Sequence, residues 1–344
     1  MSAFDEVTEW LLEDTYPLTR YNALTGLLGR SHDEPEVQAS LSQMLTSPPI
    51  QNIIRKQQPD GGFETKVVLK KYGKWEGEYG YIPKYKASTW EALFLAQANL
   101  PPIQHPVQTL GKYIIKKVYS KKLGRFLIGP CLNGRMIWVL SKFGFGNRPE
   151  VRSSFAFLVK HQRFDDGDYT PSAEEVAARD GWGEFCWGTA SCYEGIGEVL
   201  RAMTAIPKAF WTAEALELKR QAIDFMLRHQ VLHRRLKPGS KGFKHKSSYR
   251  FGEYEWLLRF QAPNIMVDAV DNITSLLLLG VESAALQDSI QHIINKRNSQ
   301  NRFIADHVLS NVYGQWGKTG KESKWITFRI LRMLKLASAQ HLLD

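Results

Sequence analysis

The sequence is poor in cysteine and has no long apolar run, and both absences restrict the kind of protein it encodes. The chain of 344 residues contains three cysteines, Cys131, Cys186 and Cys192. An odd number in a long chain argues against a disulfide framework and for a reducing compartment. No apolar run approaches the roughly 20 residues that span a bilayer, and the first residues lack the basic and apolar regions of a secretory signal. We therefore expect a cytoplasmic protein.

Strand-rich blocks and nucleic-acid reading motifs are absent too. With 43% hydrophobic and 12% aromatic residues, the chain has the composition of a globular protein. Its net charge of +10 is compatible with nucleic acid, an anionic membrane surface or a phosphorylated substrate. Because the basic residues are dispersed and no reading motif is present, we expect no nucleic-acid partner. The basic stretch 237–250 is either a solvated loop or a contact that places the protein at a membrane surface.

One short phrase recurs five times and organises the rest of the chain. It consists of two apolar residues, three further residues and a Gln or Asn. The clearest copies are 157–162, followed by an Asp-Gly turn and Tyr169, and 53–58, which closes on Phe63. Weaker copies end at Gln230 and Asn298, and the weakest, 114–118, has Val118 in place of the amide. The steps of 60, 44, 68 and 68 residues between equivalent positions are the size of supersecondary units that pack side by side.

Each copy ends a segment with helical periodicity, and another helical segment precedes the next copy. Ser88 with Glu91 three residues later predicts a capped helix start, and Thr212 predicts another. We expect six helices of one kind, alternating with the helices that end in the phrase. They begin near Leu18, Ser88, Pro130, Thr189, Met266 and Glu322.

This alternation predicts an all-α fold, an (α/α)6 toroid in which six inner helices are sheathed by six outer ones, in a single domain over residues 1–344. An open solenoid is the alternative architecture. Connections from inner to outer helices are short. Four long connections, 64–86, 163–188, 231–264 and 299–321, should all emerge from the other end of the barrel. Long loops on a rigid scaffold usually carry function, so we expect the site at that end.

The repeated phrase, followed by a Gly turn and an aromatic residue, resembles the Gln-Trp repeats of squalene-hopene cyclase and other triterpene cyclases. The alternating helices resemble the toroid that these enzymes share with protein prenyltransferase beta subunits. The best local matches, 157–169 and 53–63, end in Tyr and Phe where the family has Trp. The resemblance implies a toroid that acts on an isoprenoid or another apolar small molecule in a central cavity. At about half the length of a two-domain triterpene cyclase, the chain corresponds to one toroid standing alone.

The sequence departs from the catalytic motifs of these relatives. The resemblance implies an initiating Asp-x-Asp-Asp motif at the start of an inner helix, and the nearest stretch, Asp268 to Asn272, lacks the middle Asp. The Asp-x-Cys zinc motif of the prenyltransferases is also missing. Whether the protein is an enzyme stays open. A cofactor is unknown, since zinc or magnesium would suit the chemistry but no ligand motif indicates either.

The expected cavity mouth would gather side chains from the N-terminal ends of the inner helices, which attract anions such as a diphosphate. The predicted substrate-binding residues are Arg20, Tyr21, Trp90, Asn133, Lys324 and Trp325. Weak candidate metal ligands are Cys131, Cys186, Cys192 and His229, for which burial in the core is the alternative.

Three acidic residues are the candidates for catalysis. Asp268 and Asp271 are three residues apart on one helical face, so mutual repulsion would raise one pKa and suit a general acid. Helix capping is the alternative role for this pair. Glu194 with Asp268 would supply paired acids if the barrel is a carbohydrate-active hydrolase or lyase. A third hypothesis is a non-catalytic binding or scaffold toroid that has lost the acid.

Overall fold

Helices make up most of the regular structure, as the sequence predicts. The computed structural model describes residues 2–67, 80–126, 129–165, 191–234, 252–253, 255–339 and 343. The α-helices are α1 (Ala3–Leu12), α2 (Pro17–Gly26), α3 (Pro35–Thr46), α4 (Ile50–Ile54), α6 (Ser88–Gln97), α7 (His105–Lys117), α8 (Pro130–Lys142), α9 (Pro149–His161), α12 (Tyr193–Met203), α13 (Ala213–Arg228), α14 (Glu255–Leu258), α15 (Ala269–Leu278), α16 (Gln287–Ile294) and α17 (Lys324–Leu336).

The remaining elements are short. Two 3-10 turns, η1 (Lys208–Phe210) and η2 (Ser283–Leu286), precede α13 and α16. β1 (His233–Arg234) pairs with β2 (Gly252–Glu253) in antiparallel fashion, and β3 (Gln261–Ala262) pairs with β4 (His307–Val308) in parallel. In the described ranges, none of the helices combines the length and apolar character that crossing a bilayer requires.

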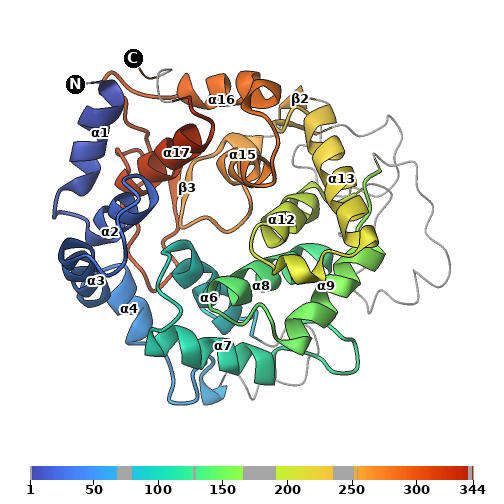
Figure 1. Cartoon of the computed structure of the whole chain (residues 1–344). Coiled ribbons are helices and arrows are strands. Elements are labelled where there is room, and N and C mark those ends of the chain that lie inside the picture. The colour runs from blue at the N-terminus through green and yellow to red at the C-terminus, as the bar shows by residue number, and fades with distance from the viewer. Residues whose placement is uncertain are drawn as a thin grey trace.

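Six helices pack in a circuit around the middle of the molecule (Figure 1). Along this circuit α2 contacts α17, α17 contacts α15, α15 contacts α12, α12 contacts α8, and α8 contacts α6. The α6 end meets α2 through hydrogen bonds: Asn22 Nδ2 donates to the Ala98 carbonyl over 3.0 Å, and Asn99 Nδ2 donates to Asn22 Oδ1 over 2.6 Å. We call these six the inner helices, and all six correspond to the segments predicted as one kind.

The other long helices lie outside this circuit (Figure 1). Helix α3 packs on α2, α7 on α6, α9 on α8, α13 on α12 and α16 on α15, while α1 contacts both α2 and α17. Each inner helix before α17 connects to the following outer helix by a short loop, so the C-terminal ends of these five helices share one end of the circuit. Their N-terminal ends share the other.

Local signals explain most helix starts, with one exception. Proline stands in the first turn of α2, α3, α7, α8 and α9, where its missing amide and fixed φ suit the start of a helix. Thr212 caps α13 as predicted, accepting from the Ala215 amide over 3.3 Å. The predicted Ser88–Glu91 capping box is wrong, because Ala87 is the N-cap and the Ser88 hydroxyl donates to Glu64. The Glu91 carboxyl group is instead fully buried, and neither of its oxygens has a hydrogen-bond partner among the described residues.

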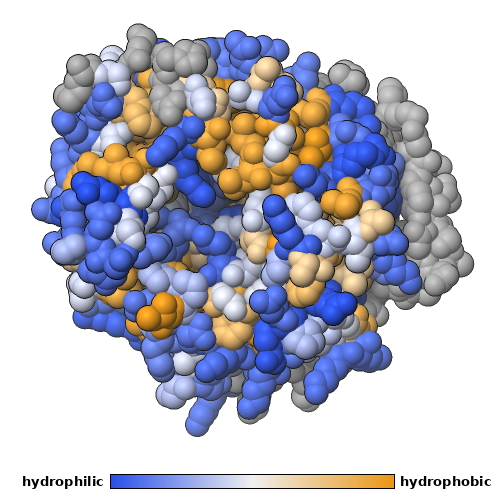
Figure 2. All heavy atoms as spheres, in the orientation of Figure 1, coloured by the Kyte–Doolittle hydropathy of each residue, from blue (hydrophilic) through white to orange (hydrophobic). Residues whose placement is uncertain are grey.

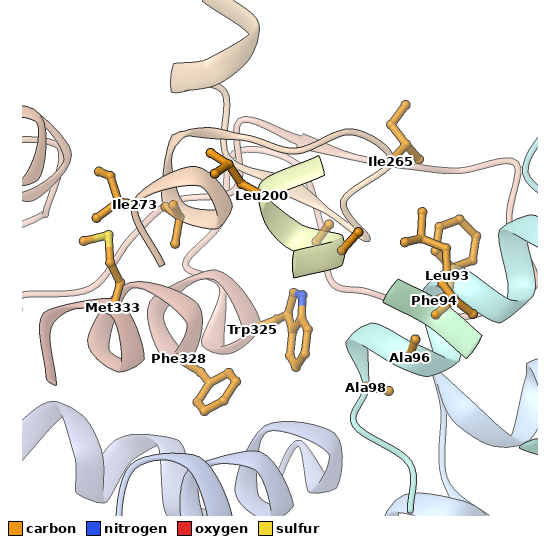
Figure 3. Packing of buried hydrophobic residues seen from close by; sticks show 14 of the residues in the cluster. Leu93, Phe94, Ala96, Ala98, Leu200, Ile265, Ile273, Trp325, Phe328 and Met333 are labelled. Carbon is orange, nitrogen blue, oxygen red and sulfur yellow. The ribbon is translucent and has the colours of Figure 1, made fainter. Parts of the chain in front are cut away.

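The inner helices are buried between the outer helices and the lumen. Every residue of α6 from Ser88 to Gln97 is buried, and Figure 3 shows part of the surrounding core, with Phe94 on α6 and Trp325 and Phe328 on α17. Helices α8 and α12 approach each other closely at Gly134. A Cβ atom there would lie 2.8 Å from the Glu198 carbonyl oxygen. Glycine therefore permits a helix contact that a larger residue would push apart.

The stretch that leads into α15 lies across the lumen, and we call residues 263–265 the floor segment. Gln97 Nε2 on α6 donates to the Asn264 carbonyl, and the Asn264 amide donates back to Gln97 Oε1 over 3.1 Å. Arg135 Nη2 on α8 donates to the Ile265 carbonyl over 2.7 Å. Part of one long connection therefore fills the barrel, where the sequence analysis expected the long connections to surround an open mouth.

Candidate functional site

A cavity lies where the inner helices end. It has three adjoining compartments of about 550, 250 and 60 Å³, and all three share Asn99 and Arg332. The lining includes the last residues of three helices, Gly26 of α2, Lys142 of α8 and Leu278 of α15. Figure 2 shows a hollow near the centre of one face of the molecule. The cavity thus opens at the C-terminal ends of the inner helices, opposite to the end predicted from loop length.

Helical periodicity brings polar side chains to the lumen, because residues three or four apart share one face. On α17, Phe328, Arg329 and Arg332 follow Trp325 at such spacings, and all four line the cavity. The same spacing recurs on α8, α12 and α15. The residues concerned are Arg135, Trp138 and Lys142 on α8, Glu198 and Arg201 on α12, and Asp271, Thr274 and Leu278 on α15.

Arg329 joins the two predicted catalytic carboxylates. Its guanidinium donates to both oxygens of Asp268, over 2.8 and 2.9 Å, and lies 2.9 Å from Asp271. Asn264 Nδ2 donates to the other Asp271 oxygen over 2.7 Å. Burial raises the pKa of Asp268. Burial also opposes ionisation of Asp271, but Arg329 and Arg201 outweigh it and lower the pKa of that carboxyl. Asp271 is therefore held as a carboxylate.

A second buried charge cluster links α8 to α12. Arg135 Nε donates to Glu198 over 3.0 Å, and Arg201 lies 3.8 Å from the other Glu198 oxygen. The Arg201 guanidinium stacks on the Trp138 ring, 3.7 Å from its centroid. This cation–π contact orients Arg201 at the cavity wall without neutralising its charge.

Lys142 and Arg332 are cations without a direct counter-ion. Neither makes a hydrogen bond or ion pair with any residue in the described part of the chain. Burial, followed by repulsion from Arg332 and Arg201, lowers the pKa of Lys142 to about 8. Burial is also the main cause that lowers the pKa of Arg332, with Asp271 opposing and Arg329 adding to the shift. Five cationic side chains thus surround this lumen with three carboxylates. Among the described residues, the positive charges of Lys142 and Arg332 are not neutralised by an ion pair.

The largest compartment adds an apolar wall to this cationic end. Ile103 is 83% exposed, an unusual position for a large aliphatic side chain. Polar groups in the same compartment come from Thr25, His32 and Gln38. The apolar part of the lining consists of Leu41, Leu100, Pro101, Pro102, Ile103 and Phe328. The cavity is therefore amphipathic, because cationic and aliphatic side chains line the same compartment.

One predicted substrate-binding residue, Trp325, lines the cavity, in its smallest compartment. Three others are buried between elements. The Tyr21 hydroxyl lies 3.2 Å from His32 Nδ1, and Trp90 donates its indole N–H to the Tyr81 carbonyl over 2.9 Å. Asn133 is also buried, and its side chain accepts from the Phe126 amide over 3.0 Å. These polar groups support neighbouring backbone.

The remaining two, Arg20 and Lys324, pair with acidic residues near α1. Arg20 bridges Asp14 and Glu36, the latter over 3.1 Å. Lys324 Nζ lies 2.9 Å from the Glu13 carboxylate. Neither lines any of the three compartments. Both residues stand at the N-terminal ends of inner helices, whereas the cavity lies at the C-terminal ends.

Of the predicted catalytic residues, Asp271 lines two compartments. Asp268 caps α15 by accepting from the Asp271 amide over 2.9 Å, so the capping alternative describes its contact. Glu194 is half-buried in the first turn of α12 and, like Asp268, lines none of the three compartments. The paired acids of a glycosidase are therefore not brought together in this cavity.

The candidate metal ligands take packing roles where they are described. Cys192 caps α12, its Sγ accepting from the Gly195 amide over 3.4 Å, and Cys131 is half-buried near the start of α8. The buried His229 ring stacks on Phe225 with centroids 4.1 Å apart. Among the described residues, no group of three or more His, Cys, Asp or Glu side chains could hold a metal ion. Cys186 and the basic stretch 237–250 lie outside the described residues.

Sequence reasoning missed the cations that give the cavity its charge, namely Lys142, Arg201, Arg329 and Arg332, and the neutral Asn99 that lines all three compartments. A signal was available on α17, where Arg329 follows the buried Trp325 by four residues and Arg332 follows the buried Phe328 by four. A charge on the inner face of a buried helix needs a partner or a ligand. Searching the inner helices for such charges would have indicated the C-terminal end.

Comparisons with known proteins leave the family open. No protein-family model matches the chain, and no curated protein matches its sequence. Among solved structures, the chain is similar to the type II terpene cyclase MstE from Scytonema in its apo form, with a TM-score of 0.32 and 10% sequence identity. The match covers 87% of this chain and 99% of that one. Similarity at this level establishes neither activity nor substrate.

Proposed function

We propose that the protein is an (α/α)6 toroid that binds a small amphipathic anion at the C-terminal ends of its inner helices. The observation that carries this proposal is the pair of cations, Lys142 and Arg332, that face one cavity without a direct counter-ion. Two half-buried cations that repel each other are unfavourable unless an anion joins them. A bound phosphate, diphosphate or carboxylate would supply the missing negative charge.

Compensation of helix dipoles is the simplest alternative role for these cations. Lys142 is the last residue of α8, where the C-terminal partial negative charge favours a cation. That effect alone would raise the pKa of the amine, whereas the pKa of Lys142 is lowered to about 8, chiefly by burial. The helix dipole therefore stabilises the charged amine less than burial and the neighbouring arginines destabilise it. A bound anion would reverse this balance.

The rest of the lining supports a ligand with an apolar body. The aliphatic side chains of Leu41, Leu100 and Ile103 line the same compartment as Lys142 and Arg332. Small-molecule sites commonly combine apolar walls with a few charged groups that fix orientation. An isoprenoid diphosphate has this chemistry and is the ligand class to test first. It also agrees with the substrate class that the resemblance to triterpene cyclases implies.

The acids favour binding over acid-initiated chemistry in this cavity. Asp271 is the carboxylate that lines it, and Arg329 and Asn264 stabilise its charged form. A proton donor would instead need an environment that stabilises the protonated form of the carboxyl group. Asp268 has the raised pKa but lies behind Arg329 as a helix cap. We therefore propose that the cavity binds an anion and does not protonate a substrate.

Isothermal titration calorimetry tests this proposal with three probes: inorganic diphosphate, geranyl diphosphate and geraniol. We expect both diphosphates to bind and geranyl diphosphate to bind more tightly, because its chain would bury apolar surface. Geraniol should bind weakly. The double variant Lys142→Met/Arg332→Gln should reduce diphosphate affinity about tenfold or more, through loss of two charge-assisted contacts.

Arg220→Gln is the matched control for the loss of a cation. Arg220 lies on the outer helix α13, is exposed and pairs with Glu217 and Asp224, so its removal should leave diphosphate binding unchanged. Equal binding by the wild type and the double variant would refute the proposal. The same holds if geraniol binds as tightly as geranyl diphosphate, since the charged end would then contribute nothing.

A further inference from the structure

Lys142 is placed at the junction of the two larger compartments, with its amine free of protein partners. It lines both the 550 and the 250 Å³ compartment. No hydrogen bond or ion pair engages its amine in the described ranges. A structural lysine at a cavity wall normally pays for its burial with an ion pair or a carbonyl contact. Lys335, near the end of α17, makes such a contact with the Leu27 carbonyl, whereas Lys142 does not.

We infer that the Lys142 amine is a nucleophile that forms a Schiff base with a small carbonyl compound carrying a phosphate or carboxylate group. This inference rests on the proposed function and names the substrate class more narrowly. Arg332 and Arg201, which line the same compartment, would hold the anionic group. The carbonyl carbon of the bound molecule would then meet the amine of Lys142.

The surroundings of Lys142 favour the neutral amine that such a reaction requires. Burial and the two arginines lower the pKa of Lys142 to about 8, so roughly a fifth of the amine is neutral near pH 7.4, against about a thousandth for an ordinary lysine. Desolvation and neighbouring cations are the two established ways of activating a lysine nucleophile. The charged groups that face Lys142 are Arg201 on α12, Asp271 on α15 and Arg332 on α17, with His32 in the larger compartment.

The reaction balances without any further reactant. The nitrogen lone pair attacks the carbonyl carbon, the C=O π bond breaks, and a proton passes from nitrogen to oxygen to give a carbinolamine. Loss of the hydroxyl group with the second amine proton then releases one water molecule and leaves the C=N bond. No oxidant, reductant or metal takes part.

Pyridoxal 5′-phosphate is a suitable probe, because it carries an aldehyde and a phosphate, and pyridoxal is its matched control without the phosphate. Each is mixed with the full-length protein and trapped with borohydride, and the labelled peptide is identified by mass spectrometry. We expect pyridoxal phosphate to label Lys142 roughly tenfold more readily than it labels exposed lysines. Pyridoxal should show no such preference, and inorganic diphosphate should suppress the labelling.

Two variants separate the amine from the charge. Lys142→Arg keeps a cation but has no nucleophilic amine, so the selective label should vanish while the urea unfolding curve stays that of a folded protein. Arg332→Gln keeps the amine but should weaken the selectivity for pyridoxal phosphate over pyridoxal. Labelling spread evenly over surface lysines would overturn the inference, as would equal labelling by the two aldehydes. If diphosphate binds and Lys142 is not labelled, the proposed function stands and this inference falls.

Discussion

Arg329 holds Asp268 through two hydrogen bonds of 2.8 and 2.9 Å, and the same guanidinium lies 2.9 Å from Asp271. One guanidinium on α17 therefore forms ion pairs with two carboxylates at the start of α15. Asp268 and Arg329 are both largely excluded from solvent, so neither could lose the other without leaving a charge in a poorly solvated site. This contact ties α17 to the start of α15 at the wall of the smallest compartment.

Arg329→Gln is expected to destabilise the protein by about 3–5 kcal/mol, because it leaves two buried carboxylates without their cation. Urea denaturation followed by circular dichroism measures the loss. Adding Asp268→Asn should restore part of it, since one of the stranded charges is then removed. Arg220→Gln on the protein surface should change stability by less than about 1 kcal/mol. A loss of similar size in both single variants would contradict this account.

The buried Glu91 is expected to make stability fall as pH rises. Burial raises the pKa of Glu91 well above its ordinary value, so the unfolded chain releases this proton first as the pH increases. The unfolding free energy should therefore decline from about pH 4.3, the ordinary value for Glu, up to the folded pKa. Glu91→Gln should abolish this decline and raise stability near neutral pH by about 1–3 kcal/mol. Unfolding curves at acidic, neutral and mildly alkaline pH would show parallel profiles if Glu91 has no such role.

The affinity for diphosphate should fall as pH rises through about 8, because Lys142 loses its charge in that range. Calorimetric titrations between about pH 7 and 9.5 measure the change, below the range in which an ordinary lysine titrates. Lys142→Met should bind more weakly at the lower pH and lose most of the pH dependence. The same fall in the variant would assign the titration to another group.

Gly134→Ala should destabilise the protein by about 1–3 kcal/mol, the usual result of overpacking a tight contact. The new methyl group would meet the Glu198 carbonyl at 2.8 Å, and backbone cannot move aside as a side-chain tip can. Gly195→Ala on the neighbouring helix α12 is the matched control, since its methyl group would have an ordinary contact of 3.4 Å with Cys192. It should be neutral or slightly stabilising, because alanine favours helix. Thermal denaturation distinguishes the two variants.

The helices could be predicted from the sequence because their causes are local. Apolar periodicity, first-turn prolines and the Thr212 cap act within a few residues, and each produced a helix where it was expected. The failed capping box at Ser88 has a distant cause, since Glu64, 24 residues earlier, takes the Ser88 hydroxyl. Local signals are reliable until a tertiary contact competes for the same group.

The described cavity lies at the end opposite to the one predicted from loop length. Loop length indicates where a connection emerges, not whether it fills the space it reaches. The floor segment lies across the barrel through the pairing of Gln97 with Asn264, which are 167 residues apart. No pattern in either neighbourhood indicates that pairing. Asp271 could be predicted because its spacing from Asp268 is a local feature. Lys142 and Arg332 could not, because they share a cavity only once α8 and α17 have packed in the folded protein.

The floor segment crosses the lumen between α6 and α8. The largest compartment lies beside the exposed Ile103 at the ends of the inner helices, and we expect a ligand to enter and leave there. A ligand held by Lys142 and Arg332 would keep its opposite end near the opening, so a label attached to that tail should be tolerated. Affinity matrices that display a diphosphate on a long tether are accordingly suited to retain this protein.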